Sequence, residues 1–210
     1  MRDRIAGDLH DDVGATLSSI NIFSRLAQEK LSYEPQQAKA LIDKINVTSQ
    51  EMMNNMSDMV WAISPGNDKS ENLSLRIKNL AREMLAPQEI KYAVQSGDEQ
   101  HKFSMEARKN IFLIAKEAIN NIAKYSQAKN VLIKMEEQNG KLLLEIVDDG
   151  VGFTPHAVGY REGSEATRGG AGLVSMKNRV EQLSGIFQIL SGPGAGTKII
   201  ALFDLDKINY

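Results

Sequence analysis

The sequence contains no cysteine among its 210 residues, which excludes disulfide bonds, thiolate metal sites and thiol nucleophiles. No apolar run approaches the roughly 20 residues that a membrane-spanning helix needs, and the charged N-terminus MRDRIAGDLHDD lacks the apolar stretch of a signal peptide. Neither sign of charge dominates, because 25 Lys and Arg face 27 Asp and Glu and leave a net charge of −2. Nucleic acid and anionic membranes are therefore not expected as direct partners. We expect a soluble chain from a reducing cytoplasm.

What the sequence does contain is the composition of a globular protein, with 42% hydrophobic and 25% charged residues. Its 210 residues allow two small domains, and the pattern changes near residue 65. Before that point, apolar or small residues recur in alternating steps of three and four, first over residues 6–27 and then over residues 38–63. This period predicts two helices that pack against other helices.

Each of the two predicted helices carries an apolar stripe that a single hairpin leaves uncovered. A second copy of the hairpin would cover both stripes and complete a four-helix bundle. We therefore expect residues 1–64 to be a dimerisation domain and the chain to be a homodimer. Residues 65–70, which begin with Pro65 and Gly66, are expected to be a linker.

Residues 71–210 hold most of the glycines and mix helical with strand patterns, so we expect a second domain there. A long helix is predicted from Ser104, its N-cap, through Gln127. The next residues alternate with period two around Asn139-Gly140, which predicts a β-hairpin with a tight turn. The predicted fold class is multi-domain: an α-helical hairpin, followed by an α+β two-layer sandwich with helices on one face of a mixed sheet.

His10 stands out in the first predicted helix because its helical neighbours are small, among them Gly7 and Gly14. A glycine inside a helix costs about 1 kcal/mol relative to alanine, so two of them near one imidazole indicate close approach of another surface. Asp11 and Asp12 follow directly, and a carboxylate near an imidazole can hold its tautomer or take its proton. The spacing does not decide which aspartate serves. A solvated surface histidine with incidental glycines is the alternative interpretation.

The long predicted helix of the second domain carries Glu117 and Asn121, which lie about one helical turn apart. Their oxygen atoms suit a magnesium ion or a water molecule, and the nearby Lys124 suits a metal-bound polyphosphate. Without other signals, these three side chains could simply be solvated on the helix surface.

Three glycine-containing segments complete the candidate site. In the first, Asp148 ends a predicted strand, where its carboxylate can accept a hydrogen bond while glycines let the backbone approach a ligand. The second precedes a helix, whose N-terminal N–H groups favour a phosphate, and the third places Thr197 at the start of a strand. The glycines in these segments include Gly150 and Gly152 after Asp148, and Gly169, Gly170 and Gly172 before the helix. Each segment alone is an ordinary turn or loop.

Taken in order, these segments resemble the sensor histidine kinases of two-component systems, in the subfamily whose response regulators are of the NarL/LuxR type. RIAGDLHDDVG resembles the subfamily's H-box, and VWAISPGND resembles the exit from its second helix. EAINN resembles its N-box, DDGVG and GGAGL its two glycine boxes, and GTKI its closing glycine-threonine element. The resemblance covers Arg2 to Phe203 and implies that residues 71–210 adopt the Bergerat, or GHKL-type, ATP-binding fold.

The resemblance implies ATP-dependent autophosphorylation on a histidine, followed by transfer of the phosphoryl group to an aspartate of a response regulator. His10 would be the phosphoacceptor and Asp11 its assisting acid or base. Glu117 would orient or polarise water, Asn121 would ligate Mg²⁺, and Lys124 would contact phosphate.

At the nucleotide, the resemblance assigns Asp148 to the amino group of adenine and Thr197 to the same base. The glycines implied to line the nucleotide and its phosphates are Gly150, Gly152, Gly170 and Gly172. Residues 153–169 would form a mobile lid over ATP, and residues 65–70 a hinge by which the second domain moves toward His10.

Two positions depart from the subfamily's pattern. Ala15 stands where many members carry a glutamine that positions water for dephosphorylation of the partner, which puts phosphatase activity in doubt. Tyr125 stands where a histidine is frequent, and it leaves the metal and adenine positions untouched. Because the chain begins almost at the H-box, we expect the cytoplasmic portion of a larger sensor with its membrane segments upstream. A soluble parent protein is the alternative.

Two other functions fit parts of the pattern. The second domain could belong to another GHKL-type ATPase or serine kinase, although these lack a helical hairpin that bears a histidine. The chain could instead be a nucleotide-binding scaffold without phosphotransfer, although Glu117, Asn121, Asp148 and the glycines are all present.

Overall fold

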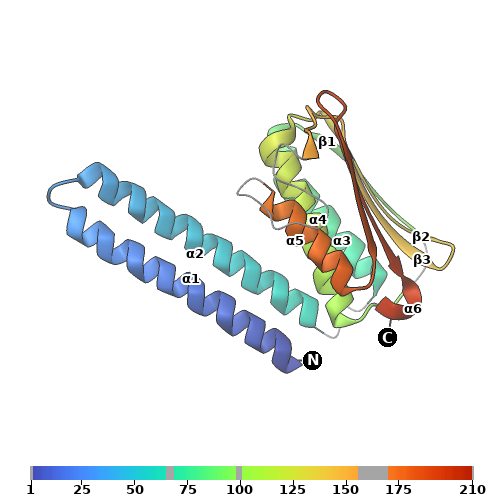
Figure 1. The fold of residues 1–210 in the computed structure, drawn as a ribbon, viewed down its shortest axis with the longest axis horizontal. Helices are drawn as coiled ribbons and strands as arrows, with labels where there is room; N and C mark the ends of the chain where they lie inside the picture. Colours follow the sequence, from blue (N-terminus) through green and yellow to red (C-terminus); the bar gives the residue numbers. More distant parts are fainter. Residues whose placement is uncertain (1, 65–68, 98–100, 156–169, 210) are drawn as a thin grey trace. The chain divides into compact units, whose positions relative to one another are not determined.

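The computed structural model describes residues 2–64, 69–97, 101–155 and 170–209. The chain forms two compact units, Met1–Trp61 and Ala62–Tyr210. Figure 1 shows the helical hairpin of the first unit and the sheet and helices of the second. In the described ranges, no helix is both long enough and apolar enough to cross a membrane.

The first unit is formed by two long helices, α1 (Arg2–Lys30) and α2 (Pro35–Ile63), as the heptad pattern predicts. Ala27 and Ala38, on either side of the turn, are both buried. Their small side chains let the two helices approach closely beside the turn. Large apolar side chains elsewhere on the hairpin stay exposed, and these include Leu17, Ile22, Ile42, Val47, Met53, Met56 and Val60. A single hairpin therefore leaves apolar surface uncovered, which is the basis of the predicted homodimer.

The second unit is built on a mixed sheet whose described strands follow the order β1-β2-β3-β5-β4. The strands are β1 (Lys91–Ser96), β2 (Asn130–Gln138), β3 (Lys141–Asp148), β4 (Ile186–Ser191) and β5 (Thr197–Asp204). β1 pairs in parallel with β2, and the remaining neighbours are antiparallel. The mixed sheet predicted from the sequence is confirmed.

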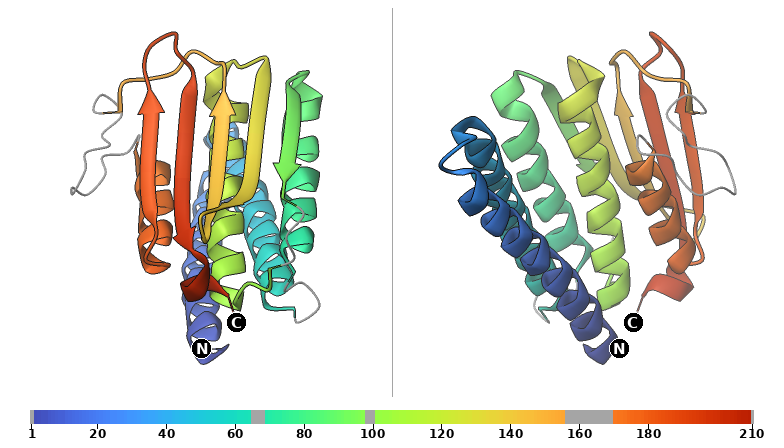
Figure 2. Two further views of the ribbon diagram at one scale, coloured as in Figure 1. Left: turned by 90° about the vertical axis from the view of Figure 1, so that its right-hand side faces the viewer. Right: turned by 60° about the vertical axis from the view of Figure 1, so that its left-hand side comes forward.

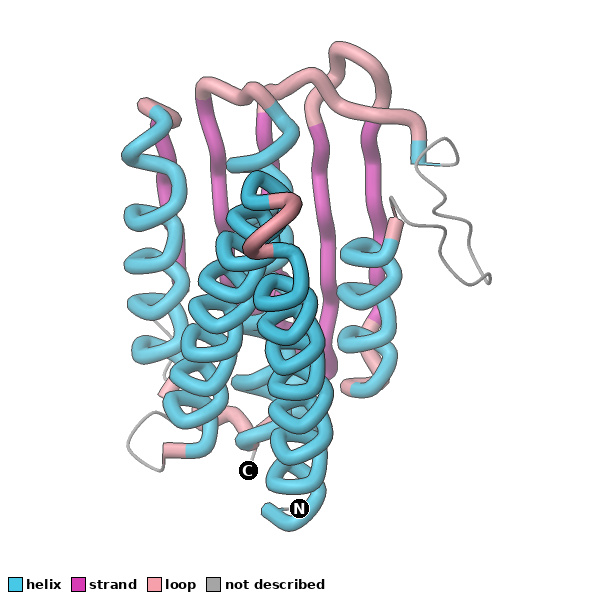
Figure 3. The backbone as a smooth tube through the Cα atoms, turned by 90° about the vertical axis from the view of Figure 1, so that its left-hand side faces the viewer, coloured by secondary structure: helices cyan, strands magenta, loops and turns pink. Residues whose placement is uncertain are grey.

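Helices lie against one face of this sheet, as Figure 2 and Figure 3 show. They are α3 (Ser70–Leu85), α4 (Met105–Asn121) and α5 (Ala171–Gln182). α4 contacts both α3 and α5 and is therefore the central helix. The 3₁₀ turn η2 (Ala86–Gln88) follows α3, and the short helix α6 (Leu205–Ile208) follows β5.

The core lies between α4 and the middle of the sheet. Ile133 of β2 pairs with Ile146 of β3, which in turn pairs with Ile199 of β5, and all three side chains are buried. α4 buries Ile114 and Ala118, whose spacing of four residues keeps them on one face of the helix. The predicted two-layer sandwich is thus the observed architecture.

The hairpin between β2 and β3 turns at Asn139 and Gly140, as predicted. Both residues have positive φ angles, 53° and 74°, which match a tight type I′ connection. Asn and Gly are the two residues that adopt this conformation at the least cost.

The long helix predicted through Gln127 ends differently in the structure. α4 stops at Asn121 and continues as one π-helical turn, η3 (Ile122–Ser126). Ser126 Oγ donates a hydrogen bond to Ile122 O at 2.8 Å, and Gln127 then adopts the left-handed conformation with φ of 53°. Single π turns inside helices are rare and occur frequently at functional sites.

The N-cap of α4 gives a test of the fold. Ser104 Oγ accepts a hydrogen bond from Ala107 N at 3.2 Å, so we expect Ser104→Ala to destabilise the second unit by about 1 kcal/mol. Urea denaturation followed by circular dichroism would measure the loss, and Ser104→Thr should restore most of it. Ser96→Ala, at the exposed end of β1, is the matched control. Equal stability of Ser104→Ala and the parent chain would contradict this role of the cap.

Candidate functional site

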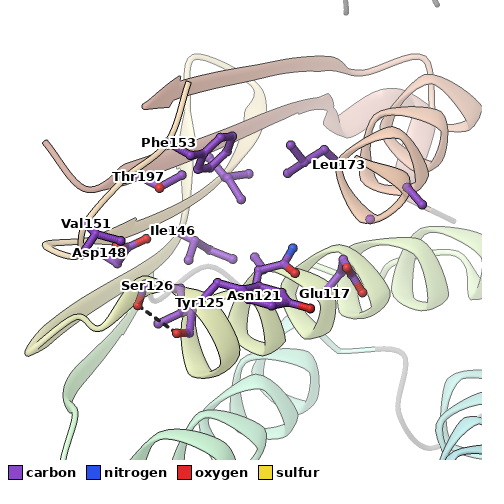
Figure 4. A pocket seen from close by; sticks show the side chains of 16 residues that line it. Glu117, Asn121, Tyr125, Ser126, Ile146, Asp148, Val151, Phe153, Leu173 and Thr197 are labelled. Carbon is purple, nitrogen blue, oxygen red and sulfur yellow. Dashed lines mark hydrogen bonds between the residues drawn. The ribbon is translucent and has the colours of Figure 1, made fainter. Parts of the chain in front are cut away.

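A cavity of about 550 Å³ opens between α4 and η3 on one side and the ends of β3 and β5 and the start of α5 on the other. Figure 4 shows the side chains around it. The lining residues are Glu117, Ala118, Asn121, Ile122, Tyr125, Ser126, Ile146, Asp148, Val151, Gly152, Phe153, Ala171, Gly172, Leu173, Thr197 and Ile199. Its walls are mostly apolar and its few polar groups are clustered, which is typical of a small-molecule site.

α4 contributes two oxygen-bearing side chains to the cavity, Glu117 and Asn121. Both are half-buried, and Figure 4 shows them side by side along the helix. The first turn of α5 packs directly on Glu117, because a Cβ atom at Gly172 would collide with the Glu117 carboxylate. A glycine at this position therefore lets the N-terminus of α5 reach the cavity.

η3 forms the next part of the same wall through Tyr125 and Ser126. Ser126 is buried, and its carbonyl oxygen accepts a hydrogen bond from Val151 N at 2.7 Å. A Cβ atom at Gly150 would collide with that carbonyl. Gly150 thus allows the end of η3 to pack against the loop that follows β3.

Asp148 ends β3 and is buried, with 6% of its surface exposed, while its side chain borders the cavity. Its Oδ1 accepts a hydrogen bond from Gly150 N at 2.9 Å, and the backbone of Thr197 also donates to the carboxylate. Burial raises the pKa of Asp148 above its usual value, the Gly150 hydrogen bond opposes this, and the neighbouring charge of Asp149 adds to it.

Thr197 lies opposite Asp148 in the pairing of β3 with β5. Its Oγ1 lies 3.1 Å from Ser191 Oγ, which itself lies 2.9 Å from Gly196 O and donates to it. Because Ser191 has only one hydroxyl proton, Thr197 must be the donor in their mutual bond. Thr197 therefore offers the cavity an acceptor oxygen, next to the acceptor oxygens of Asp148.

Asp149 has the opposite environment to Asp148. It is exposed, and its Oδ1 accepts hydrogen bonds from Lys129 N and Asn130 N, both at 2.8 Å. Hydrogen bonds from the Asn130 side chain and then from its backbone lower the pKa of Asp149 below the usual range. Asp148 therefore lines the cavity, whereas Asp149 accepts hydrogen bonds from the backbone of a neighbouring segment.

The structure brings together most of the residues predicted for the nucleotide. Those that line the cavity are Glu117, Asn121, Asp148, Gly152, Gly172 and Thr197. Lys124 is exposed on η3, Gly150 is buried against Ser126, and Gly170 is buried just before α5; none of these three lines the cavity.

The remaining predictions concern the phosphoacceptor, the lid and the linker. His10 and Asp11 lie in α1, in the first unit, and their side chains are outside the described part of the chain. Of the predicted lid, only residues 153–155 are described, and Phe153 lines the cavity. Of the predicted linker, residues 65–68 lie outside the described ranges, whereas Lys69 already pairs with Lys102 and α3 begins at Ser70.

Sequence reasoning missed most of the apolar lining. Ile146 could have been found by strand alternation, because it lies two residues before Asp148 and so shares its face. Tyr125 lies four residues after Asn121 and could have been placed with it. Ser126, Val151, Leu173 and Ile199 carried no such signal.

The described residues contain no group of three or more His, Cys, Asp or Glu side chains that could hold a metal ion. Glu117 and Asn121 nevertheless supply the hard oxygen donors that Mg²⁺ prefers. A magnesium ion would fit here only with part of its coordination shell completed by ligand oxygens or water, as is usual for this ion with phosphates.

Comparison with known families identifies both units. Residues 2–68 match a family model described as histidine kinase. Residues 106–207 match the model of histidine kinase-, DNA gyrase B- and HSP90-like ATPases. The cavity lies wholly within the ATPase match, so the polar groups around it belong to an ATPase domain.

Among curated proteins, the sensor histidine kinase LiaS of Bacillus subtilis is 26% identical over 205 residues, which cover 94% of this chain and 52% of LiaS. The sensor histidine kinase DesK of the same organism is 24% identical over 188 residues, which cover 90% of this chain and 47% of DesK. The chain thus spans about half the length of these relatives.

Solved structures share the fold. The histidine kinase AdeS of Acinetobacter baumannii superposes with a TM-score of 0.60 at 14% identity, over 94% of this chain and 98% of that one. The blue-light activated histidine kinase EL346 of Erythrobacter litoralis gives 0.57 at 16% identity, over 97% of this chain and 60% of that one. With a histidine kinase match in its first unit and an ATPase match in its second, the chain belongs to the sensor histidine kinase family.

The raised pKa of Asp148 predicts a conflict between stability and binding. Because the pKa of Asp148 is higher in the folded than in the unfolded chain, its contribution to stability is complete at pH values below the unfolded-state pKa. That contribution is lost as the pH rises through the folded-state pKa. At neutral pH the charged, buried carboxylate of Asp148 therefore lowers the free energy of unfolding. We expect Asp148→Asn, which keeps an acceptor oxygen, to raise the melting temperature at pH 7 and to abolish ATP binding.

Calorimetric melting across a pH series would measure the stability difference, which should shrink as pH falls through the raised pKa. A variant that melts below the parent chain at pH 7 would contradict this account.

Proposed function

We propose that this chain is an ATP-dependent protein-histidine kinase, which phosphorylates itself on His10 and passes the phosphoryl group to an aspartate of a response regulator. The observation that carries the proposal is the placement of two kinds of polar group in one apolar cavity. Asp148 and Thr197 offer hydrogen-bond acceptor oxygens at one end of the cavity. Glu117 and Asn121, along α4, offer oxygen atoms that can ligate a metal ion.

The acceptor pair suits adenine. The exocyclic amino group of adenine donates two hydrogen bonds, and guanine has a carbonyl oxygen at the same position. A buried carboxylate beside a hydroxyl oxygen would attract the amino group and repel the carbonyl. The apolar side chains of Ile146, Val151 and Ile199 would enclose the base.

The α4 wall suits the triphosphate. Asn121 would hold Mg²⁺, with Glu117 orienting water beside it and Lys124, exposed on η3, contacting phosphate. When bound, the magnesium ion neutralises phosphate charge. Gly150, Gly152 and Gly172 allow close packing of the protein around the cavity. Gly170 and Gly172 lie at the N-terminal end of α5, where N–H groups would favour a phosphate.

In the reaction, a ring nitrogen of His10 attacks the γ-phosphorus. The bond from that phosphorus to the bridging oxygen breaks, ADP leaves with the electron pair, and the imidazole loses one proton. Asp11 takes this proton or holds the imidazole in the reactive tautomer. Such a reaction depends mainly on positioning and charge neutralisation, so a separate unit can supply the nucleophile.

The partners proposed are a second copy of this chain, through residues 1–64, and the receiver domain of a NarL/LuxR-type response regulator. The exposed apolar side chains of the hairpin support the first. The similarity to LiaS and DesK, together with the H-box pattern RIAGDLHDDVG, supports the second. We place the reaction in the cytoplasm and propose that this chain is the cytoplasmic portion of a membrane-anchored sensor.

Incubation with γ-labelled ATP and magnesium tests the nucleophile. We expect an acid-labile, alkali-stable label on the parent chain and none on His10→Gln, because a phosphoramidate has that stability and the variant lacks the acceptor nitrogen. A label that survives the substitution would show that His10 is not the nucleophile. ATP binding without any label would favour a scaffold.

Asn121→Asp tests the metal side of the site. The substitution adds a second carboxylate one turn from Glu117, and we expect ATP affinity in magnesium to fall by about tenfold or more, because an unfavourable charge in a partly buried site costs about 1–3 kcal/mol. Titration calorimetry measures the change. Asn120→Asp, on the same helix but outside the cavity lining, is the matched control and should bind normally. Equal loss in both variants would argue against a specific role for Asn121.

A further inference from the structure

Asp149 lies next to the cavity but does not line it, and its carboxylate binds the segment between η3 and β2 instead. Oδ1 accepts hydrogen bonds from Lys129 N and Asn130 N at 2.8 Å each, and Oδ2 accepts one from Asn130 Nδ2 at 2.7 Å. Asp149 N also donates to Asn130 O at 3.3 Å. Four hydrogen bonds thus connect this residue to two consecutive positions.

The same segment is held at its other end by the same loop. Ser126 O accepts a hydrogen bond from Val151 N at 2.7 Å, two residues beyond Asp149. Residues 126–130 are therefore fixed at both ends on residues 149–151. Between the two ends, Ala128 N donates a hydrogen bond to Ser126 Oγ at 3.1 Å, which restricts the conformation of the intervening backbone.

This double attachment matters because Ser126 and Tyr125 form one wall of the cavity while Asp148 and Val151 form the facing one. The π turn ends at Ser126, and Gln127 follows it in the left-handed conformation, outside any regular element. Movement at Lys129 and Asn130 would consequently shift Ser126 relative to Asp148.

We propose that Asp149 is a positioning residue, which sets the spacing between the η3 wall and the Asp148 wall and so determines how tightly the cavity holds its nucleotide. The proposal rests on the proposed function for the identity of the ligand as ATP. Its structural part, that Asp149 holds Ser126 against Val151, is independent of that identity.

The geometry distinguishes a specific clamp from a general need for charge. In Asn130→Asp, the new carboxylate faces the carboxylate of Asp149, and two acceptors cannot bond. Exchanging the two residues, Asp149→Asn with Asn130→Asp, restores a donor opposite an acceptor. The double exchange should therefore recover what Asn130→Asp loses.

The experiment uses the full chain and two measurements. Titration calorimetry with magnesium and a non-hydrolysable ATP analogue measures affinity. Amide hydrogen exchange by NMR measures protection of Val151 N, whose bond to Ser126 O reports the wall directly. Asp204→Asn is the matched control, because its carboxylate accepts a hydrogen bond from Asp206 N at 3.2 Å at the opposite end of β5 from Thr197.

We expect Asp149→Ala and Asn130→Asp to weaken affinity by about tenfold, because the loss of charge-assisted hydrogen bonds lets the η3 wall move relative to Asp148. Protection of Val151 N should fall with it, the double exchange should restore both, and Asp204→Asn should change neither. Unchanged affinity in Asp149→Ala, unchanged protection of Val151 N, or failure of the exchange to rescue would overturn the proposal. A parent chain that binds no ATP analogue would refute the proposed function, and the exchange of Val151 N would still decide whether Asp149 holds the wall.

Discussion

The antiparallel pairing of β3 with β5 is the constraint on which the rest of the site depends. It places Asp148 opposite Thr197, and it supplies the Thr197 N–H group, which together with Gly150 N makes a buried carboxylate tolerable. Without β5 beside it, the end of β3 would expose Asp148 to water and leave no paired acceptors facing the cavity. The long-range pairing therefore creates the chemistry, whereas the Asp-Gly sequence by itself is only a turn.

A second level of organisation lies in the contrast between neighbouring carboxylates. Burial destabilises the charged form of Asp148, whereas hydrogen bonds from Asn130 and from the Lys129 backbone stabilise the charged form of Asp149. Asp148 lines the cavity, where a ligand with matching hydrogen-bond donors would offset the unfavourable free energy of its buried charge. Asp149 is exposed, and its hydrogen bonds stabilise the neighbouring segment at Lys129 and Asn130. Stability and binding are thus divided between adjacent positions of one loop.

Local patterns in the sequence predicted the parts of the fold that depend on local interactions. Heptad spacing predicted α1 and α2, and Asn139-Gly140 predicted the hairpin, because each depends on a few neighbouring residues. The spacing of Glu117 and Asn121 predicted their common face. The position of β5 between β3 and β4 is a long-range property, so the lining contributed by Ile199 could not be anticipated. The π turn was equally invisible, because nothing in IAKYS distinguishes it from an α-helical turn.

That π turn has a consequence for how chains of this kind are compared. A π turn contains about one residue more than an α turn, and successive residues of an α-helix are about 100° apart. Ser126 lines the same cavity as Asn121, although five residues along an ordinary α-helix would separate their directions by about 140°. An alignment that matches this segment position by position to an uninterrupted helix would equate side chains on different faces. The extra residue of the π turn, rather than a substitution, then decides whether the side chain at position 126 reaches the cavity.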